Sequence, residues 1–226
     1  MYFDQYYLIL VVPTIILSMW AQIMVKSTFD KYSKIFCSRR ITGVDAAALL
    51  MRTNNINDVR VEAVNGSLTD HYDPGAKILR LSEPVYGSSS IAAVGVAAHE
   101  TGHAIQHAVG WGPLVMRSTL VPVANIGSSL GPWLAIAGFF FSFPLLINIG
   151  ILLFSAAVLF YVITLPVEFD ASGRAIAILR ANNVLTEEEL KGVKKVLTAA
   201  ALTYVASALT AIASLLRLIL LSRGRR

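Results

Sequence analysis

Three long stretches of this chain contain no Asp, Glu, Lys or Arg, and they restrict its fold more than any other feature. They are residues 5–25, 118–167 and 196–216. A helix needs about 20 residues to cross a hydrocarbon core about 30 Å thick, so each stretch is long enough to span a membrane. The middle stretch is long enough to span it twice, as a hairpin over 120–141 and 145–165 that breaks at Ser142-Phe143-Pro144. The sequence therefore predicts a mainly α integral membrane protein with three to four transmembrane helices.

The charges that flank the first stretch predict its orientation. No basic residue precedes it, which does not fit a cleaved signal peptide. By the positive-inside rule, we expect the N-terminus outside and residue 26 onward in the cytoplasm. The net charge of +5 mostly reflects this bias, and it predicts contact with anionic lipid headgroups and not with nucleic acid. The basic residues concerned are Lys26, Lys31, Lys34, Arg39 and Arg40.

The last uncharged stretch, 196–216, leaves two interpretations open. With four spans and the N-terminus outside, the C-terminal tail would also lie outside, yet its arginines favour the cytoplasm. The stretch is also rich in Ala and Thr, so it could instead form a core or interfacial helix. We favour a span. The arginines of the tail are Arg217, Arg223, Arg225 and Arg226.

The segment His99-Glu-Thr-Gly-His103 is an HExxH motif and carries the main functional signal. Residues four apart share one face of a helix, so both imidazoles can present a neutral nitrogen to the same metal ion. Glu100 can then act as general base toward a water that the metal activates. This arrangement is typical of zinc hydrolases, although two histidines on an amphipathic helix can also be ordinary polar residues.

Local patterns predict a small α+β unit around this motif. Thr42 is expected to cap a helix over 45–52, and residues 59–64 and 77–82 read as short strands on either side of a turn-like segment at 70–75. A longer helix is expected from Ile91 to about Val109. Because the second strand directly precedes this helix, we expect residues 77–82 to form the edge on which an extended peptide docks.

A catalytic zinc requires a third protein ligand, and the other histidines fit this role poorly. Gln106 and Val109 occupy the positions at which a metzincin would have Gly and His. His107 is about 80° around the helix from His99, so three ligands from one helix are unfavourable, and His71 is a remote alternative. Cys37 is the only cysteine, which excludes a cysteine-based zinc site.

Glu168 is the better third ligand. It follows Pro166 immediately after the predicted hairpin, where we expect a new helix to begin. A hairpin of two spans returns the chain to the side that it left, so Glu168 should emerge at the membrane face of His99 and His103. The competing interpretation is that an acid here simply favours the positive end of a helix.

Three segments resemble the YugP-like family of bacterial membrane zinc metallopeptidases: residues 99–106 (HETGHAIQ), 70–74 (DHYDP) and 165–172 (LPVEFDAS). The similarity extends from about Tyr32 to Ala211, and more distantly to the HtpX and CAAX-prenyl protease gluzincins. The resemblance implies two histidine ligands from HExxH and a glutamate ligand from an ExxxD motif, which falls on Glu168. Ser172 stands where that motif has Asp, so either Asp170 or Ser172 could orient a ligand histidine.

The predicted organisation has five parts, with the catalytic unit at the cytoplasmic face. Residues 1–25 form an N-terminal transmembrane helix, 26–118 the gluzincin-like catalytic unit with the HExxH helix, and 119–165 the transmembrane hairpin. Residues 166–195 form a cytoplasmic helical segment with the third zinc ligand, and 196–226 an apolar helix with a basic tail. We expect a multi-pass protein of the bacterial inner membrane whose active site faces the cytoplasm.

The predicted function is a zinc-dependent metalloendopeptidase with one Zn²⁺ per chain, held by His99, His103 and Glu168, with Glu100 as general base. Its expected partners are the lipid bilayer and a peptide or membrane-protein substrate, and oligomerisation is left open. The alternative is a noncatalytic zinc-binding membrane scaffold, which a site closed by a further histidine would favour. A transporter is disfavoured because residues 118–167 carry no charge. The groups that could donate to an oxyanion are Tyr72, His71, Arg174 and Tyr204.

Overall fold

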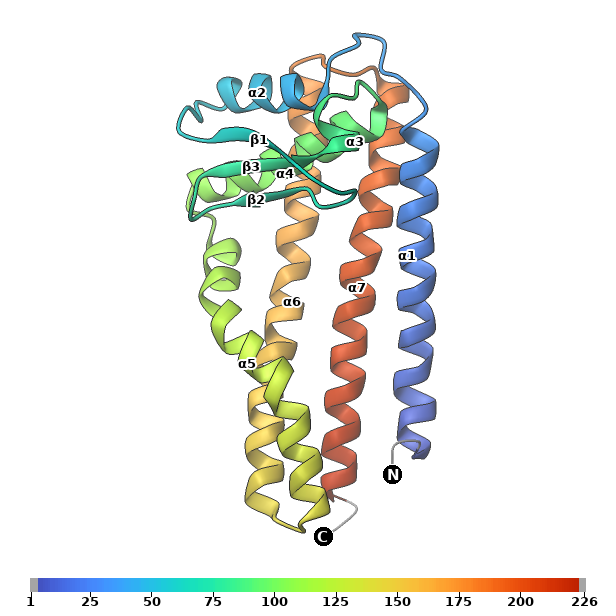
Figure 1. The fold of residues 1–226 in the computed structure, drawn as a ribbon, viewed down its shortest axis with the longest axis vertical. Coiled ribbons are helices and arrows are strands. Elements are labelled where there is room, and N and C mark those ends of the chain that lie inside the picture. Colours follow the sequence, from blue (N-terminus) through green and yellow to red (C-terminus); the bar gives the residue numbers. More distant parts are fainter. Residues whose placement is uncertain (1–3, 224–226) are drawn as a thin grey trace. The chain divides into compact units, whose positions relative to one another are not determined.

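The computed structural model describes residues 4–223, and its fold is mainly helical (Figure 1). A short π-helix (Tyr7–Val11) leads into α1 (Val12–Tyr32), and three other helices are also long and apolar enough to cross a membrane. These are α5 (Gly112–Phe140), α6 (Pro144–Ala181) and α7 (Glu187–Arg223). The structure therefore contains four candidate spans, and the last uncharged stretch lies within one of them. The remaining elements are α2 (Gly43–Thr53), β1 (Arg60–Val64), β2 (His71–Asp73), β3 (Ile78–Ser82), α3 (Glu83–Tyr86) and α4 (Ile91–Ala108).

The chain divides into two compact units. The helical unit comprises the described parts of 1–22, 115–166 and 202–226. The mixed unit comprises residues 23–114 and 167–201, and it contains the sheet together with α2, α3 and α4. Helices α1, α6 and α7 each contribute residues to both units. Helix α6 thus supplies 144–166 to the helical unit and 167–181 to the mixed unit.

Small residues allow α5 and α6 to approach each other closely in the helical unit. A Cβ atom at Gly127 would lie 2.2 Å from the carbonyl oxygen of Leu153, and one at Gly150 would lie 2.5 Å from the amide nitrogen of Ala135. Only glycine can occupy such positions, because any side chain would overlap the facing backbone. Gly127 and Gly150 therefore serve packing between α5 and α6 within one chain.

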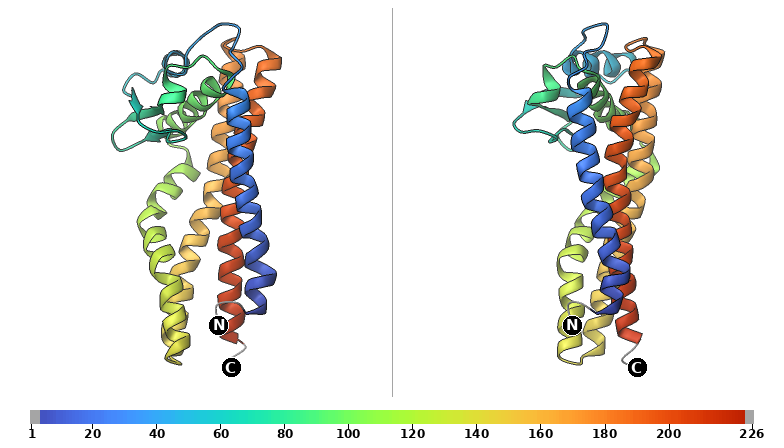
Figure 2. Two further views of the ribbon diagram at one scale, coloured as in Figure 1. Left: turned by 45° about the vertical axis from the view of Figure 1, so that its right-hand side comes forward. Right: turned by 90° about the vertical axis from the view of Figure 1, so that its right-hand side faces the viewer.

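Helices α1 and α7 lie side by side in the same unit (Figure 2). Polar side chains connect these two ends of the chain. The hydroxyls of Ser18 and Thr210 lie 3.4 Å apart. Near the chain ends, the Arg217 guanidinium donates to the Asp4 carboxylate with an Nη2–Oδ2 distance of 2.6 Å. The guanidinium also lies over the Tyr7 ring. These contacts tie the first and last candidate spans together at this end of the unit.

The mixed unit contains a three-stranded sheet in the order β1-β3-β2. Strand β3 pairs in parallel with β1, with Arg60 opposite Ile78, and antiparallel with β2, with Tyr72 opposite Leu79. The prediction that residues 77–82 form a sheet edge is therefore wrong, because both sides of β3 are paired. The segment at 70–75 was expected to be only a turn, but Asp70 accepts hydrogen bonds from the Ser82 backbone and hydroxyl and so fixes β2 beside β3.

Helix α4 occupies the centre of the mixed unit. Its N-cap is Ser90, whose hydroxyl accepts from the amide of Ala93 at 3.2 Å. Helix α2, capped by Thr42 as predicted, packs against α4, and both contribute to one apolar core. On another side of α4, a Cβ atom at Gly102 would lie 2.6 Å from the carbonyl oxygen of Ala171. Glycine at this position lets α4 lie almost in backbone contact with α6.

Helix α6 does not begin after Pro166. It runs from Pro144 to Ala181 with Pro166 inside it, so the expected helix start at this point is wrong. Proline removes one backbone hydrogen bond, but long apolar helices of membrane proteins tolerate this loss. Glu168 is consequently far from either end of its helix. The interpretation that it merely stabilises a helix N-terminus no longer applies.

Candidate metal centre

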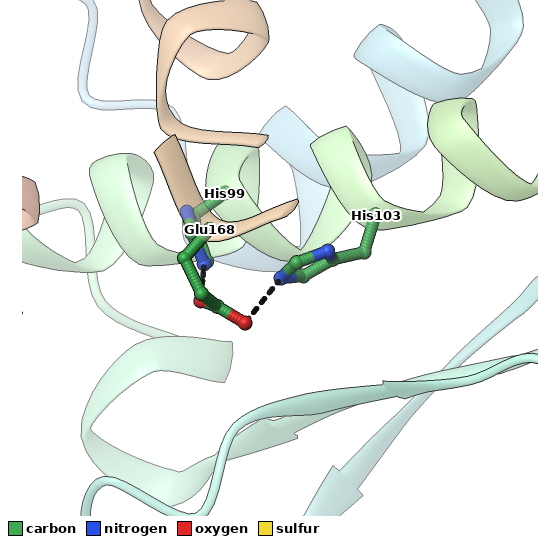
Figure 3. Close-up of side chains that lie close together, drawn as sticks. All are labelled: His99, His103 and Glu168. Carbon is green, nitrogen blue, oxygen red and sulfur yellow. Dashed lines mark ion pairs between the residues drawn. The ribbon is translucent and has the colours of Figure 1, made fainter. Parts of the chain in front are cut away.

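Three predicted ligand residues converge in the mixed unit. His99 and His103 project from one face of α4, and Glu168 projects toward them from α6 (Figure 3). The Nε2 atom of His99 lies 3.4 Å from Oε2 of Glu168, and Nε2 of His103 lies 3.7 Å from Oε1. The ligand atoms of all three residues lie within 4.8 Å of one another. The close approach of α4 and α6 at Gly102 explains how residues from distant parts of the sequence meet.

The donor set and its spacing fit zinc. Two imidazoles and one carboxylate are the ligands of many catalytic zinc sites, which leave a fourth position open for water. Ligands about 2.0–2.1 Å from a tetrahedral ion are roughly 3.3 Å apart. The nitrogen–oxygen distances of 3.4 and 3.7 Å are close to this separation. Among the described residues, no other histidine, cysteine or acidic side chain joins this group.

The second nitrogen of each ligand histidine also has a partner. The Nδ1 atom of His99 lies 3.2 Å from the Ser172 hydroxyl, and Nδ1 of His103 lies 3.0 Å from Oε1 of Gln106. Both rings therefore direct Nε2 toward Glu168. Such contacts fix the orientation and tautomer of metal-binding imidazoles. Ser172 thus contacts a candidate ligand histidine directly, from the position where the related ExxxD motif has an aspartate.

Burial strengthens the electrostatic coupling within the cluster. Glu168 is 2% exposed, whereas His103 and Glu100 are each 8% exposed. Burial alone would lower the pKa of His103, but a hydrogen bond with Glu168 and the nearby Glu100 carboxylate raise it above its ordinary value. The same two carboxylates would favour a divalent cation at this position. Glu100 lies close enough to His103 to affect its pKa, but it does not belong to the group of three candidate ligands.

The remaining histidines do not join this group. His107 lies on α4, and its Nδ1 is 2.7 Å from the hydroxyl of Tyr72 on β2. Burial, with contributions from Asp58 and Asp73, raises the pKa of Tyr72 to about 12, so this phenol remains a hydrogen-bond donor at physiological pH. His71 is exposed and contacts the Thr69 carbonyl and Arg80. The two alternative third ligands thus have other partners.

The two further candidates for oxyanion donation are placed differently. The Nε atom of Arg174 donates to the Asp170 carboxylate, and its guanidinium lies 5.9 Å from the centre of the Trp111 ring. Tyr204 belongs to the helical unit. The positions of Arg174 and Tyr204 thus give no support for either residue as the oxyanion donor.

Gln106 is the residue that the sequence interpretation missed. There it excluded a third histidine of the metzincin type and ended the HETGHAIQ segment, but it was given no role of its own. A polar side chain three positions after a ligand histidine shares its helix face, and Gln106 is fully buried. That spacing was the available signal, but a single glutamine has no motif value without the residues that face it.

Comparisons with known proteins also indicate a family of zinc peptidases. Residues 7–223 match the family model described as "Putative neutral zinc metallopeptidase". The chain is 48% identical over 215 residues to "Putative membrane protease YugP" of Bacillus subtilis (strain 168), which covers 95% of this chain and 96% of that relative. No solved structure matches the chain.

Proposed function

This chain belongs to the family described as "Putative neutral zinc metallopeptidase", and we propose that it is a zinc-dependent endopeptidase of the bacterial cell membrane. The observation that carries the proposal is the convergence of His99, His103 and Glu168, with ligand atoms within 4.8 Å of one another. The HExxH glutamate, Glu100, is buried beside them. The predicted ligand set and the family membership thus point to the same chemistry.

The residues of the chain have distinct roles in the proposed reaction. When bound, zinc would supply a Lewis acid that makes a water nucleophilic near neutral pH and polarises the scissile carbonyl. Glu100 takes the proton of the attacking water and delivers it to the leaving amine. Ser172 and Gln106 hold the two imidazoles so that Nε2 of each faces the metal position. Glu168 supplies the charge that favours a cation there.

The substrate class that we propose is a peptide or membrane-protein segment near the membrane surface. Glu168 is the first charged residue after the uncharged stretch 118–167, and it lies in the same continuous helix. A ligand at that point lies at the boundary of the hydrocarbon layer. A cavity of about 280 Å³ also lies beside α4, lined in part by Ala104, His107 and Tyr72, and offers room next to the HExxH helix.

The metal site is tested first, by the zinc content of detergent-purified protein measured with elemental mass spectrometry. We expect about one zinc per wild-type chain and strong loss in Glu168→Gln, which preserves the shape of the side chain. Glu187→Gln is the matched control, because Glu187 is exposed and pairs with Arg180. Equal zinc in wild type and Glu168→Gln would remove Glu168 from the ligand set.

Catalysis is tested separately with Glu100→Gln. We expect this variant to retain its zinc and to lose roughly 100- to 10,000-fold in the rate of peptide cleavage, because general base catalysis is removed. Glu83→Gln, at an exposed glutamate, should cleave at the wild-type rate. If zinc-loaded wild type and Glu100→Gln both fail to cleave a broad mixture of peptides and membrane proteins, the noncatalytic scaffold replaces this proposal.

Orientation is the remaining part of the proposal. The basic residues in the last part of α1 and just after it support a cytoplasmic mixed unit, whereas the α5–α6 turn at Ser142 should lie outside. In a Cys37→Ser background, a membrane-impermeant maleimide should label Ser142→Cys in intact cells and should not label Lys34→Cys. The reverse pattern would place the active site on the outer face.

A further inference from the structure

Gln106 makes three hydrogen bonds from a position with no solvent exposure. Its Oε1 atom lies 3.0 Å from Nδ1 of His103, on the same helix. Its Nε2 atom donates to two oxygen atoms of α6, the carbonyl of Val167 at 2.9 Å and a carboxylate oxygen of Asp170 at 2.8 Å. A single buried amide therefore links a predicted metal ligand on α4 to the helix that carries Glu168.

The partners of this amide determine its orientation. A backbone carbonyl and an ionised carboxylate only accept hydrogen bonds, so the two hydrogens of the Gln106 amide must face Val167 and Asp170. The oxygen of the amide must then face His103 and accept a hydrogen from its Nδ1. With Nδ1 carrying a hydrogen in this way, the Nε2 lone pair of His103 is available toward the metal position.

We infer that Gln106 is a positioning residue of the metal centre, which holds His103 in the tautomer and ring orientation that metal binding requires. The inference rests on the zinc site of the proposed function. Gln106 acts through His103, and it does not touch the position of the metal or the substrate. Removing such a partner of a metal-binding histidine typically weakens metal affinity about 10- to 100-fold.

Asp170 and its neighbours hold Gln106 in place. The Asp170 carboxylate accepts from Nε of Arg174 as well as from the Gln106 amide. The Arg174 guanidinium lies over the ring of Trp111. The backbone amide of Trp111 donates to the backbone carbonyl of Gln106 at 2.9 Å. The related ExxxD motif would orient a histidine with one carboxylate. In this chain Ser172 contacts His99, and Asp170 reaches His103 only through the glutamine amide.

The decisive variant is Gln106→Leu, which keeps a side chain of similar size and removes all three hydrogen bonds. Its matched control is Thr101→Val. Thr101 is also fully buried on α4, and its hydroxyl bonds only the Ala97 carbonyl of its own helix. Zinc affinity, measured in detergent by chelator competition, should fall about 10- to 100-fold in Gln106→Leu and remain at the wild-type value in Thr101→Val.

Nitrogen NMR supplies a readout that a purely structural role would not change. The chain has four histidines, so ¹⁵N-histidine labelling gives few signals. In zinc-loaded wild type and in Thr101→Val, His103 should show a slowly exchanging hydrogen on Nδ1. In Gln106→Leu that hydrogen should exchange rapidly, because its acceptor is gone.

A second variant covers the case in which Gln106→Leu does not fold. Asp170→Asn places a group at position 170 that can also donate, so the Gln106 amide is no longer held in one orientation. We expect a smaller loss of zinc affinity and faster exchange at Nδ1 of His103. Wild-type affinity and slow exchange in both variants, or in Asp170→Asn alone if the first is unfolded, would overturn the inference while leaving the zinc site intact. A folded wild type that binds no zinc would overturn the proposed function as well.

Discussion

In the helical unit α5 and α6 meet through small residues, whereas the mixed unit encloses most of the buried polar groups. Among the described residues, Thr164 is the buried polar side chain of the helical unit, and its hydroxyl bonds only the Phe160 carbonyl of its own helix. In the mixed unit, some buried polar groups connect different elements, as the Gln106 amide does between α4 and α6. Those buried in the mixed unit are Ser82, Ser90, Glu100, Thr101, His103, Gln106 and Glu168.

The difference shows two ways of making helices specific for one another. Apolar surface gives little preference between partners in lipid, so close backbone approach at glycine selects the α5–α6 pairing. In the mixed unit, directional hydrogen bonds select both the pairing and the orientation of each side chain. A substitution in the helical unit should therefore change stability alone, whereas one around the buried polar groups should change metal affinity.

The largest effect on stability should come from filling a glycine contact in the helical unit. A Cβ atom at Gly150 would lie 2.5 Å from the Ala135 nitrogen, so Gly150→Ala must force α5 and α6 apart. We expect a loss of up to about 3 kcal/mol in the free energy of unfolding, measured in detergent. Zinc bound per folded chain should be unchanged.

The control for this prediction is Gly173→Ala, on the same helix. No atom lies within 4 Å of the added Cβ there, so the usual advantage of alanine in a helix should stabilise the protein by up to about 1 kcal/mol. Stabilisation by both substitutions would show that the α5–α6 contact does not depend on glycine.

The next largest effect should come from Gly102 in the mixed unit, where the separation of α4 and α6 should affect zinc affinity. A Cβ atom at this position would lie 2.6 Å from the Ala171 carbonyl oxygen and would push α4 away from α6. Because Glu168 and the two histidines lie on these helices, we expect Gly102→Ala to weaken zinc binding about 10-fold or more, as other disturbances around metal ligands do. Chelator competition measures this loss. Wild-type affinity in Gly102→Ala would mean that the site tolerates a wider separation of the helices.

A smaller, pH-dependent effect is expected for the ion pair of Asp4 and Arg217 in the helical unit. Burial tends to raise the pKa of Asp4, but hydrogen bonds from Arg217 and the Tyr7 backbone lower it below the ordinary value of 3.8. The pair should therefore stabilise the folded state above pH 3.8, and this contribution should be lost as the pH falls toward the lowered pKa. The difference in unfolding temperature between wild type and Asp4→Asn should be present at pH 7 and should close in acid. A difference that persists unchanged at the lowest pH would exclude the charge as its cause.

The smallest effect is expected for exposed ion pairs of the mixed unit. Lys77 and Asp58 form such a pair, with side chains 51% and 62% exposed. Solvent screens these charges, so Asp58→Asn should not measurably change the unfolding temperature or the zinc affinity. A marked loss of zinc binding in this variant would mean that polar groups at the surface of the mixed unit also control the site.

The elements that the sequence predicted well are those with strong local signals. The HExxH spacing, the uncharged stretches and the Thr42 cap each depend on residues within a few positions of one another. Another local feature is the capping box of Thr186 and Glu189, in which the Thr186 amide donates to the Glu189 carboxylate at 2.7 Å. Glu168 was predicted from membrane topology, and the structure places it with the two histidines.

The features that were missed depend on contacts between distant residues. The β2 strand is only three residues long and is held by pairing with β3 and by the Asp70–Ser82 bonds, so its own sequence reads as a turn. The continuity of α6 through Pro166 depends on its surroundings. The role of Gln106 depends on Val167 and Asp170, more than sixty positions away. A single sequence contains these residues without indicating that they meet.

The order of the ligands along the chain has a consequence for biosynthesis. The ribosome completes α4, with His99 and His103, before it begins α5, and Glu168 emerges only after α5 and the first part of α6 have been made. Under the proposed function, a nascent chain would lack a complete zinc site until α5 and the first part of α6 have been synthesised. Such a chain would be unable to cleave peptides before these candidate membrane spans have been made.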